Sequence, residues 1–458
     1  MNTKPAVESL DAFLFGRAPH PVTCGRGVEI GGGRMIPEIN FTLPGIEVTR
    51  RNWDEIRRQY EEMVRGVLRH AVELEVPAVV VEFETLPPMT QTPEWGLEIT
   101  RILAENCAAF SDRHGLATAL RVTPNDTREF RRPPLMRRGE HWEQMVRFFD
   151  GAGRAGADLL AIESTGGKEV CDDALVNADL RRVVFALGVL GARDMGFLWE
   201  QIVRSCRNTD VVPSGDTACG FANTAMTLAW KGMIPKVFAA LVRVISVPRS
   251  LVAFETGARG PSKDCAYEGP FLKAIAGVPI SMEGRSSACA HSSPLGNIAQ
   301  AVCDCWSNES VANVRLLSGY APVVSMEQLA YDCRLANAAL DDSPEAARSL
   351  RDWLASSDAS LDPQAYVLRP DIVLEISEEI LTGATTYERT IRAARAGWRI
   401  LDRAHRKAAL NLTPREARWL GRMESAVTEL PETEAEMREA MAGEIPANAY
   451  LPEEYGLT

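Results

Sequence analysis

The sequence predicts an α/β protein that folds as a closed (β/α)8 barrel of the TIM type, with an N-terminal extension of loops and a short strand and with helical C-terminal additions. Helical and strand-like patterns alternate over roughly 250 residues, as a barrel of this size requires. The strand-like segments are continuous apolar runs, which is typical of parallel strands covered on both faces. The Gly-rich dinucleotide fingerprint of an open doubly wound sheet is absent from the sequence.

The first β and α units are the clearest. Apolar residues recur at helical spacing from Trp53 to Val76, and the chain then enters the β-branched run "PAVVVEF". The same order of helix and strand repeats twice more, at intervals of about forty residues. The expected helices cover 53–76, 96–113 and 140–156, and the strands that follow them cover 77–83, 116–123 and 157–164.

Further strands are expected later in the chain, with a weaker pattern. The candidate segments are 210–216, 236–247, 278–284 and 311–317. A helix should begin near Phe221, and another helical pattern begins near Pro294 and contains Cys303 and Cys305. Residues at positions i and i+2 of a helix face apart, so these two cysteines are interpreted as core residues.

The pattern divides the chain into three regions. Residues 1–50 form an N-terminal extension packed on the barrel, residues 51–342 form the barrel core with its metal site, and residues 343–458 form a helical C-terminal region. The last region is rich in charge, and its Glu-rich end is most simply a solvated helix or arm.

The composition excludes some classes of function. A net charge of −12 and a pI near 5.2 argue against nucleic acid, whose phosphates such a surface would repel. The N-terminus has no signal-like apolar stretch, and no uninterrupted apolar run of 18 or more residues suggests a membrane span. We therefore expect a cytoplasmic protein whose ten cysteines are reduced, most of them in the core.

Glu163 is the first candidate site residue. In a (β/α)8 barrel, reactive groups sit at the C-terminal ends of the strands and in the loops that follow. Glu163 closes the mostly apolar run "ADLLAIE" and precedes the small-residue loop "STGGKE". A functional carboxylate is the preferred interpretation, and a buried structural ion pair is the alternative.

Two cysteines lie in similar positions. Cys219 follows a predicted strand and precedes a predicted helix, whose positive N-terminal end would favour the thiolate. Cys265 lies in the glycine-flanked loop "GPSKDCAYEGPF". Two thiolates and one carboxylate would give zinc three protein ligands and leave one position open, which is the pattern of a catalytic site. Cys289 and His291 remain open as further ligands or neighbours of the metal.

Four longer strings resemble a known family. They are "EIGGGRMIPEINFTLP" at 29–44, "SGDTACGFANTAM" at 214–226, the segment from 260 to 301 beginning "GPSKDCAYEGPF", and "WSNESV" at 306–311. Together the strings resemble the zinc-bearing methyltransferase subunit of the methanol:corrinoid methyltransferase family. The resemblance spans most of the chain. It implies a TIM barrel with helical additions, a bound zinc ion and a separate corrinoid protein as partner.

The resemblance also implies the ligands and the reaction. The family's one Glu and two Cys ligands fall on Glu163, Cys219 and Cys265. Zinc would act as a Lewis acid on the oxygen of methanol while Co(I) of the partner's corrinoid takes the methyl group. Lys263, Asp216 and His291 are candidate donors of a proton or hydrogen bond to the departing oxygen. We expect a homo-oligomer within a hetero-oligomeric complex.

Three alternatives remain open at this point. The first is the same zinc and corrinoid chemistry with another methyl donor, such as a methoxylated aromatic compound. The second is a non-catalytic scaffold that binds the corrinoid protein, with a fourth protein ligand closing the metal site. The third is a methyltransferase in which zinc activates a nucleophilic thiol.

Overall fold

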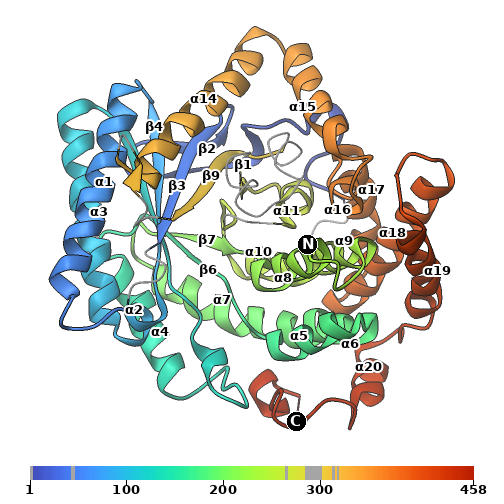
Figure 1. The fold of residues 1–458 in the computed structure, drawn as a ribbon. Helices are drawn as coiled ribbons and strands as arrows, with labels where there is room; N and C mark the ends of the chain where they lie inside the picture. Colours follow the sequence, from blue (N-terminus) through green and yellow to red (C-terminus); the bar gives the residue numbers. More distant parts are fainter. Residues whose placement is uncertain are drawn as a thin grey trace.

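Seven parallel strands form a curved sheet that is wrapped by helices (Figure 1). The structure, a computed structural model, describes residues 4–42, 47–263, 267–283, 302–311, 315–316 and 319–457. The order in the sheet is β7-β6-β5-β4-β3-β9-β8. The strands are β3 (Ile36–Thr42), β4 (Ala78–Glu84), β5 (Ala117–Thr123), β6 (Leu159–Ile162), β7 (Val212–Asp216), β8 (Ser281–Glu283) and β9 (Cys305–Val311).

Residues 259–262 occupy the eighth position and close the barrel between β7 and β8. The N–H groups of Arg259 and Gly260 donate to the carbonyls of Pro213 and Ser214 in β7, at 2.8 and 2.7 Å. On the other side, the N–H of Ser262 donates to the carbonyl of Pro279, just before β8, at 3.1 Å. The predicted (β/α)8 barrel of the TIM type is thereby confirmed.

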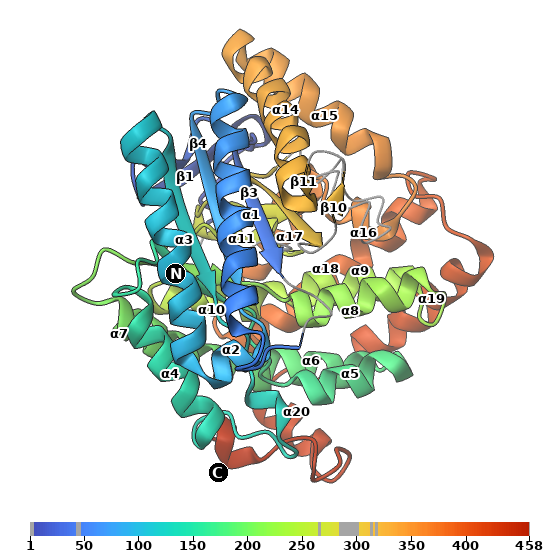
Figure 2. The ribbon, with the colours of Figure 1, turned by 60° about the vertical axis from the view of Figure 1, so that its left-hand side comes forward.

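Helices cover the outside of the barrel, and α1 and α3 lie side by side on it (Figure 2). The apolar stripe predicted in the sequence explains α1, because Ile56, Tyr60 and Met63 are fully buried there. The helices between strands are α1 (Trp53–Glu73), α2 (Pro87–Gln91), α3 (Pro93–His114), α4 (Glu140–Ala152), α5 (Lys168–Asn177), α6 (Leu180–Phe185), the π-helical turn Ala186–Gly191, α7 (Ala192–Cys206), α8 (Cys219–Trp230), α9 (Lys236–Ile245), α10 (Val247–Thr256) and α11 (Gly269–Ala276).

An antiparallel hairpin of β1 (Arg17–Cys24) and β2 (Val28–Gly32) closes the N-terminal end of the barrel. The buried side chains of Val22 and Ile30 pack in one cluster with residues at the start of the barrel strands, among them Leu159 and Val212. The extension therefore lies at one end of the barrel, as expected. However, β3 pairs with β4 and β9 as a full barrel strand, so the barrel begins within the segment 1–50 that the sequence assigned to the extension.

Beyond the barrel the chain is helical, as predicted. Figure 1 shows α17, α18 and α19 at the side of the molecule away from α1 and α3, whereas α14 packs on α1. Helix α18 packs closely on α9, since a Cβ added at Gly397 would lie 2.9 Å from the side chain of Leu241. The helices are α14 (Ala321–Asp342), which follows β9, and then α15 (Pro344–Asp358), α16 (Pro363–Tyr366), α17 (Pro370–Leu381), α18 (Thr386–Arg406), α19 (Pro414–Thr428) and α20 (Glu434–Met441).

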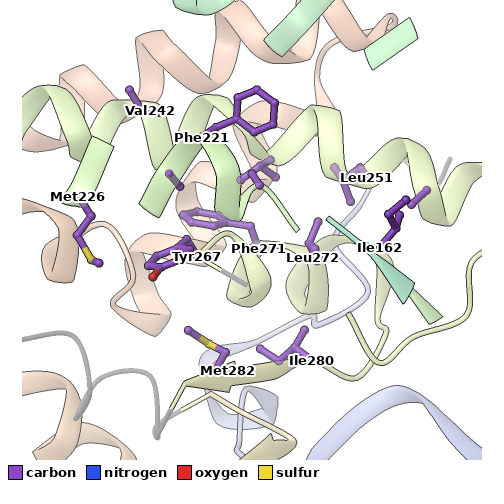
Figure 3. Close-up of a cluster of buried hydrophobic side chains, with 14 of the residues drawn as sticks. Ile162, Phe221, Met226, Val242, Leu251, Tyr267, Phe271, Leu272, Ile280 and Met282 are labelled. Atoms are coloured by element: carbon purple, nitrogen blue, oxygen red, sulfur yellow. The ribbon is translucent and has the colours of Figure 1, made fainter. Parts of the chain in front are cut away.

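The core joins the barrel to these outer helices. One cluster of buried side chains has members from both parts, such as Val242 of α9 and Ile400 of α18. Figure 3 shows a portion of this cluster inside the barrel part, with Ile162 of β6 and Leu251 of α10 near Phe271 and Leu272 of α11. All four side chains are fully buried. Because strands, barrel helices and the C-terminal layer share apolar contacts, the parts of the chain that carry the site are held on one rigid frame.

Two sequence expectations about elements are wrong. Residues 236–247 form helix α9 and the start of α10 rather than a strand. Every residue of α9 after Lys236 is buried, so the run shows no alternation that separates helix from strand. Cys305 begins strand β9 instead of lying in a helix, which puts this strand at 305–311, ahead of the predicted 311–317. Cys303 and Cys305 are fully buried, which confirms their interpretation as core residues.

One stretch of the described chain is long and apolar enough to cross a membrane. It runs over Lys236–Thr256, which comprises α9 and α10, and 94% of its most apolar window is buried inside the protein. Burial of this extent is typical of core helices in a globular protein.

Candidate functional site

A charged layer crosses the middle of the barrel, where branched apolar side chains usually pack. Arg121 of β5 donates to Glu38 of β3, with Nε 2.6 Å from Oε1, and both side chains are fully buried. Arg121 also donates to the Ser214 hydroxyl at 2.9 Å and to the carbonyls of Pro261 and Ser262 at 3.1 Å. This layer therefore fixes the segment at the eighth position, which leads directly to Lys263.

Lys263 lies at the C-terminal ends of the strands, which we call the barrel mouth. Its Nζ is 3.1 Å from Glu82 Oε1, 3.3 Å from Glu84 Oε1 and 3.4 Å from Glu163 Oε1. The side chains of Lys263 and Glu82 are fully buried, whereas those of Glu84 and Glu163 are 18% and 30% exposed. One ammonium group thus faces three carboxylates, and the most exposed of these belongs to Glu163.

The two carboxylates from β4 have further partners. The Thr123 hydroxyl donates to Glu82 Oε1 at 2.7 Å, and Asn40 Nδ2 donates to Glu84 Oε2 at 3.2 Å. Burial raises the pKa of Glu82, although the nearby charge of Lys263 opposes the shift. Burial also raises the pKa of Tyr60, and the charge of Glu84 adds to that shift. The mouth is therefore rich in negative charge, which suits a bound cation.

Cys219 stands at the same end of the barrel. It is the first residue of α8, and it follows β7, the neighbour of the strand that ends before Glu163. Asn223 Nδ2 donates weakly to Cys219 Sγ at 3.9 Å. Among the eight cysteines within the described residues, Cys219 is the only one that is not buried. A thiol with this exposure can meet a metal ion.

The buried cysteines are poor ligands by comparison. Burial raises the pKa of Cys24, Cys107 and Cys206 to about 12, so these groups stay protonated at neutral pH. Cys171, which follows Glu163 closely in sequence, is fully buried, and burial raises its pKa as well. The structure thus separates Cys219 from the other thiols that it describes.

Asp216 is placed differently from Glu163 and Lys263. Its Oδ1 accepts from the N–H groups of Ser164 and Thr217, and its Oδ2 accepts from Trp199 Nε1 at 3.1 Å. The carboxylate is fully buried, and burial raises its pKa although Arg249, 3.7 Å away, opposes the shift. Asp216 therefore lies in the wall between β6 and β7, where it holds the ends of these strands together.

The remaining candidates lie outside the described residues. These are Cys265, Cys289 and His291. Within the described part of the chain, no group of three or more His, Cys, Asp or Glu side chains has the spacing of a metal site. The structure thus brings together Glu163 and Lys263 and places Cys219 at the same end of the barrel.

Sequence reasoning missed several residues at the mouth. Glu82 and Glu84 are hard to single out because β4 is otherwise apolar, although two glutamates at alternating positions in such a strand are unusual. Arg121 in "ATALRVT" gives the same signal. A charged residue inside a strand covered on both faces must have a buried partner, and this rule could have identified the layer.

The comparisons with known proteins agree over almost the whole chain. The family model described as "Methanol-cobalamin methyltransferase B subunit" matches residues 1–456. A methanol–corrinoid protein co-methyltransferase from Methanosarcina barkeri is 37% identical over 435 residues, covering 94% of this chain and 93% of that protein. A crystal structure of the methanol:cobalamin methyltransferase complex from Methanosarcina barkeri contains a similar chain, with a TM-score of 0.93, 35% identity and 99% coverage of both chains. The chain therefore belongs to the methanol-cobalamin methyltransferase B subunit family.

Proposed function

We propose that this protein transfers the methyl group of methanol to the Co(I) corrinoid of a partner corrinoid protein, and that it holds a zinc ion with Glu163, Cys219 and Cys265. Membership of the family makes the chain a methyltransferase. The names of its relatives point to methanol as the substrate and to a corrinoid protein as the partner. The identity of the metal and the residues that bind it are our inference.

The observation that carries the metal proposal is the pairing of donor types at the mouth. Glu163 is the most exposed of the three carboxylates around Lys263, and Cys219 is the only described cysteine that is not buried. Both follow adjacent strands. Cys265 lies two positions after Lys263 in the sequence. Thiolate and carboxylate oxygen are accepted zinc ligands, and three protein ligands leave a position for substrate. The donor set therefore fits zinc.

When bound, the zinc ion would supply Lewis-acid stabilisation to the alcohol oxygen, which is otherwise a very poor leaving group as hydroxide. The chain itself has to hold Glu163 in place. Lys263 contributes to this, since its Nζ lies 3.4 Å from Glu163 Oε1. Ion pairs with Glu82 and Glu84 hold that Nζ in place. A second set of contacts that orients a metal ligand in this way is a common feature of metal sites.

The reaction consumes one proton: methanol, Co(I) and H⁺ give methyl–Co(III) and water. Of the three donors expected from sequence, Lys263 is the one favoured by its place beside Glu163. The oxygens of Asp216 are already occupied by backbone N–H groups and Trp199, which favours a role in the barrel wall. His291 stays a prediction, as do the homo-oligomer and the competing methyl donors.

The test combines metal analysis with an assay of methyl transfer. We expect wild-type protein to hold about one zinc per chain and to convert Co(I) corrinoid in the presence of methanol, followed by its visible spectrum. Glu163→Gln, Cys219→Ala and Cys265→Ala should each lose both zinc and activity. Full zinc retention in any of these variants would exclude that residue as a ligand.

Two matched variants control for general damage. Glu169→Gln removes a carboxylate whose side chain is 32% exposed, close to the 30% of Glu163, but which pairs with Arg132 on the surface. Cys206→Ala removes a buried thiol at the end of α7. Both should keep zinc and activity, because Glu169 pairs with Arg132 and not with Lys263, and Cys206 precedes β7 at the opposite end of the barrel.

A further inference from the structure

The loop of four residues after Glu163 is held in place by hydrogen bonds to several other parts of the chain. The Ser164 N–H donates to Asp216, and its carbonyl accepts from Arg249 Nη2 at 2.9 Å. Both the N–H and the hydroxyl of Thr165 donate to Asp126 Oδ2, at 2.9 and 3.0 Å. Most of these partners come from the barrel strands and their neighbouring helices, so this part of the support is local to the mouth.

The last contact of this loop comes from the far end of the chain. The N–H of Gly167, which caps helix α5, donates to the hydroxyl of Tyr455 at 3.1 Å. Tyr455 is separated from Gly167 by 288 positions and is 1% exposed. The first N–H groups of a helix have no partner within the helix, so the tyrosine oxygen satisfies one that would otherwise stay unpaired.

The loop has little room to rearrange if this contact is lost. Gly167 has a φ of +82°, and a Cβ at this position would lie 2.5 Å from the carbonyl oxygen of Ala186. A Cβ at Gly166 would lie 2.3 Å from the side chain of Asp194. The two glycines therefore allow a close approach of backbone to core, and small shifts here are transmitted along the loop to Glu163.

The C-terminal segment that carries Tyr455 is itself anchored. Glu454, which is 2% exposed, accepts from the N–H of Arg137 at 2.8 Å and from Arg138 Nε at 2.5 Å. Arg193 donates to the carbonyl of Gly456 at 3.3 Å. The segment thus binds the loop after β5 as well as the loop after β6, and both loops belong to the barrel mouth.

We propose that residues 450–457 are a positioning element for the metal site and that Tyr455 is its positioning residue, whose hydroxyl fixes Gly167 and thereby the carboxylate of Glu163. The inference rests on the proposed function, because it assigns a consequence for zinc binding. It goes beyond that function by giving the C-terminal end of the chain a part in the site, although Tyr455 touches neither metal nor substrate.

The test compares two tyrosines of the same segment. Tyr455→Phe removes the hydroxyl that accepts from Gly167 and keeps the ring. Tyr450→Phe makes the same change in the neighbouring ring, whose centroid is 6.1 Å away. The hydroxyl of Tyr450 makes no hydrogen bond to the part of the chain that the structure describes. Zinc affinity is measured by competition with a chromophoric chelator, and Co(II)-loaded protein reports the ligand geometry through its visible absorption.

We expect Tyr455→Phe to weaken zinc binding about threefold to tenfold, less than the 10–100-fold typical for direct partners of a ligand. The Co(II) absorption bands should shift in Tyr455→Phe and stay unchanged in Tyr450→Phe. A second pair covers the case that Tyr455→Phe folds poorly. Glu454→Gln loosens the same segment and should also weaken zinc binding, whereas Glu453→Gln, on a side chain that is 48% exposed, should not.

The outcomes separate the two proposals. Equal zinc affinity and equal Co(II) spectra in wild type, Tyr455→Phe and Glu454→Gln would overturn the positioning role, even if these variants were less stable to heat. Wild-type protein that binds no zinc would overturn the proposed function and, with it, this inference.

Discussion

At the scale of the residue, the unusual feature is a buried lysine with more than one carboxylate. Lys263 faces Glu82, Glu84 and Glu163, whereas the other fully buried lysine of the described chain, Lys273, pairs with Asp304 alone and donates to two backbone carbonyls. Removing charges from water is costly unless they are paired. The cluster around Lys263 is therefore stable only as a set.

The first prediction concerns this set. Lys263→Met should lower the free energy of unfolding by about 3–5 kcal/mol, because buried carboxylates lose their counter-ion. It should also abolish methyl transfer. Urea unfolding gives the first quantity, and the assay with Co(I) corrinoid gives the second. The matched variant Lys273→Met should lose stability to a similar degree but keep zinc, since it lies away from the mouth.

The loss in Lys263→Met should depend on pH. Burial holds the pKa of Glu82 above its unfolded value, and removing the lysine charge raises this pKa further. A carboxyl group with a raised pKa binds more protons in the folded state, so stability falls as pH rises through the range between the two values. The deficit relative to wild type should thus be smaller near about pH 5 than near about pH 8. A deficit that is independent of pH would contradict the assignment.

Sequence reasoning could reach some of these residues but not others. Glu163 and Cys219 could be identified because each follows a predicted strand, where barrel chemistry is located. Glu82 could not be linked to Lys263, nor Tyr455 to Gly167, because such contacts join positions 181 or 288 apart whose proximity only the closed barrel creates. Local patterns carry no information about pairs of this kind.

At the scale of the element, the two ends of the barrel differ in character: the hairpin β1–β2 covers one end, and the mouth forms the other. The hairpin fills the N-terminal end with apolar side chains such as Val22 and Ile30. The charged groups gather at the other end. In barrels of this type, the N-terminal end generally serves stability and the C-terminal end serves chemistry.

This division gives a second prediction. Ile30→Ala should lower the free energy of unfolding by about 2–5 kcal/mol, because it leaves a cavity under the barrel. The rate of methyl transfer at saturating methanol should stay within about twofold of wild type when measured below the unfolding range. Val176→Ala, on a side chain that is 64% exposed, serves as the control and should change neither quantity. A large loss of zinc in Ile30→Ala would show that the two ends are coupled.

Helices and strands could be predicted from the sequence where apolar residues on one face of the element alternate with polar residues on the other. Helix α1 was recovered within three residues at its end, since its stripe alternates with charged positions. Strand β9 is not predicted because its sequence, "CWSNESV", is mostly polar and lacks the continuous apolar run of the other barrel strands. Helix α9 was missed for the opposite reason, because burial on all sides removes the period on which the distinction depends.

At the scale of the whole molecule, the C-terminal layer makes the chain one cooperative unit. Helix α18 packs on α9, and the final segment returns to the barrel mouth through Tyr455. Zinc at the mouth would therefore stabilise the entire fold and not a single loop. Binding to the folded state alone adds about 2.7 kcal/mol at a free concentration of 100 times the dissociation constant.

The last prediction uses this coupling. Zinc should raise the unfolding temperature of metal-free wild-type protein by a few degrees, followed by calorimetry, and a chelator should reverse the shift. Cys219→Ala should show no shift at the same zinc concentration, whereas Cys206→Ala should shift as wild type does. Mg²⁺ should have no effect on any of the three, because it prefers oxygen ligands and octahedral geometry. An equal zinc shift in Cys219→Ala would place the stabilising metal elsewhere on the protein.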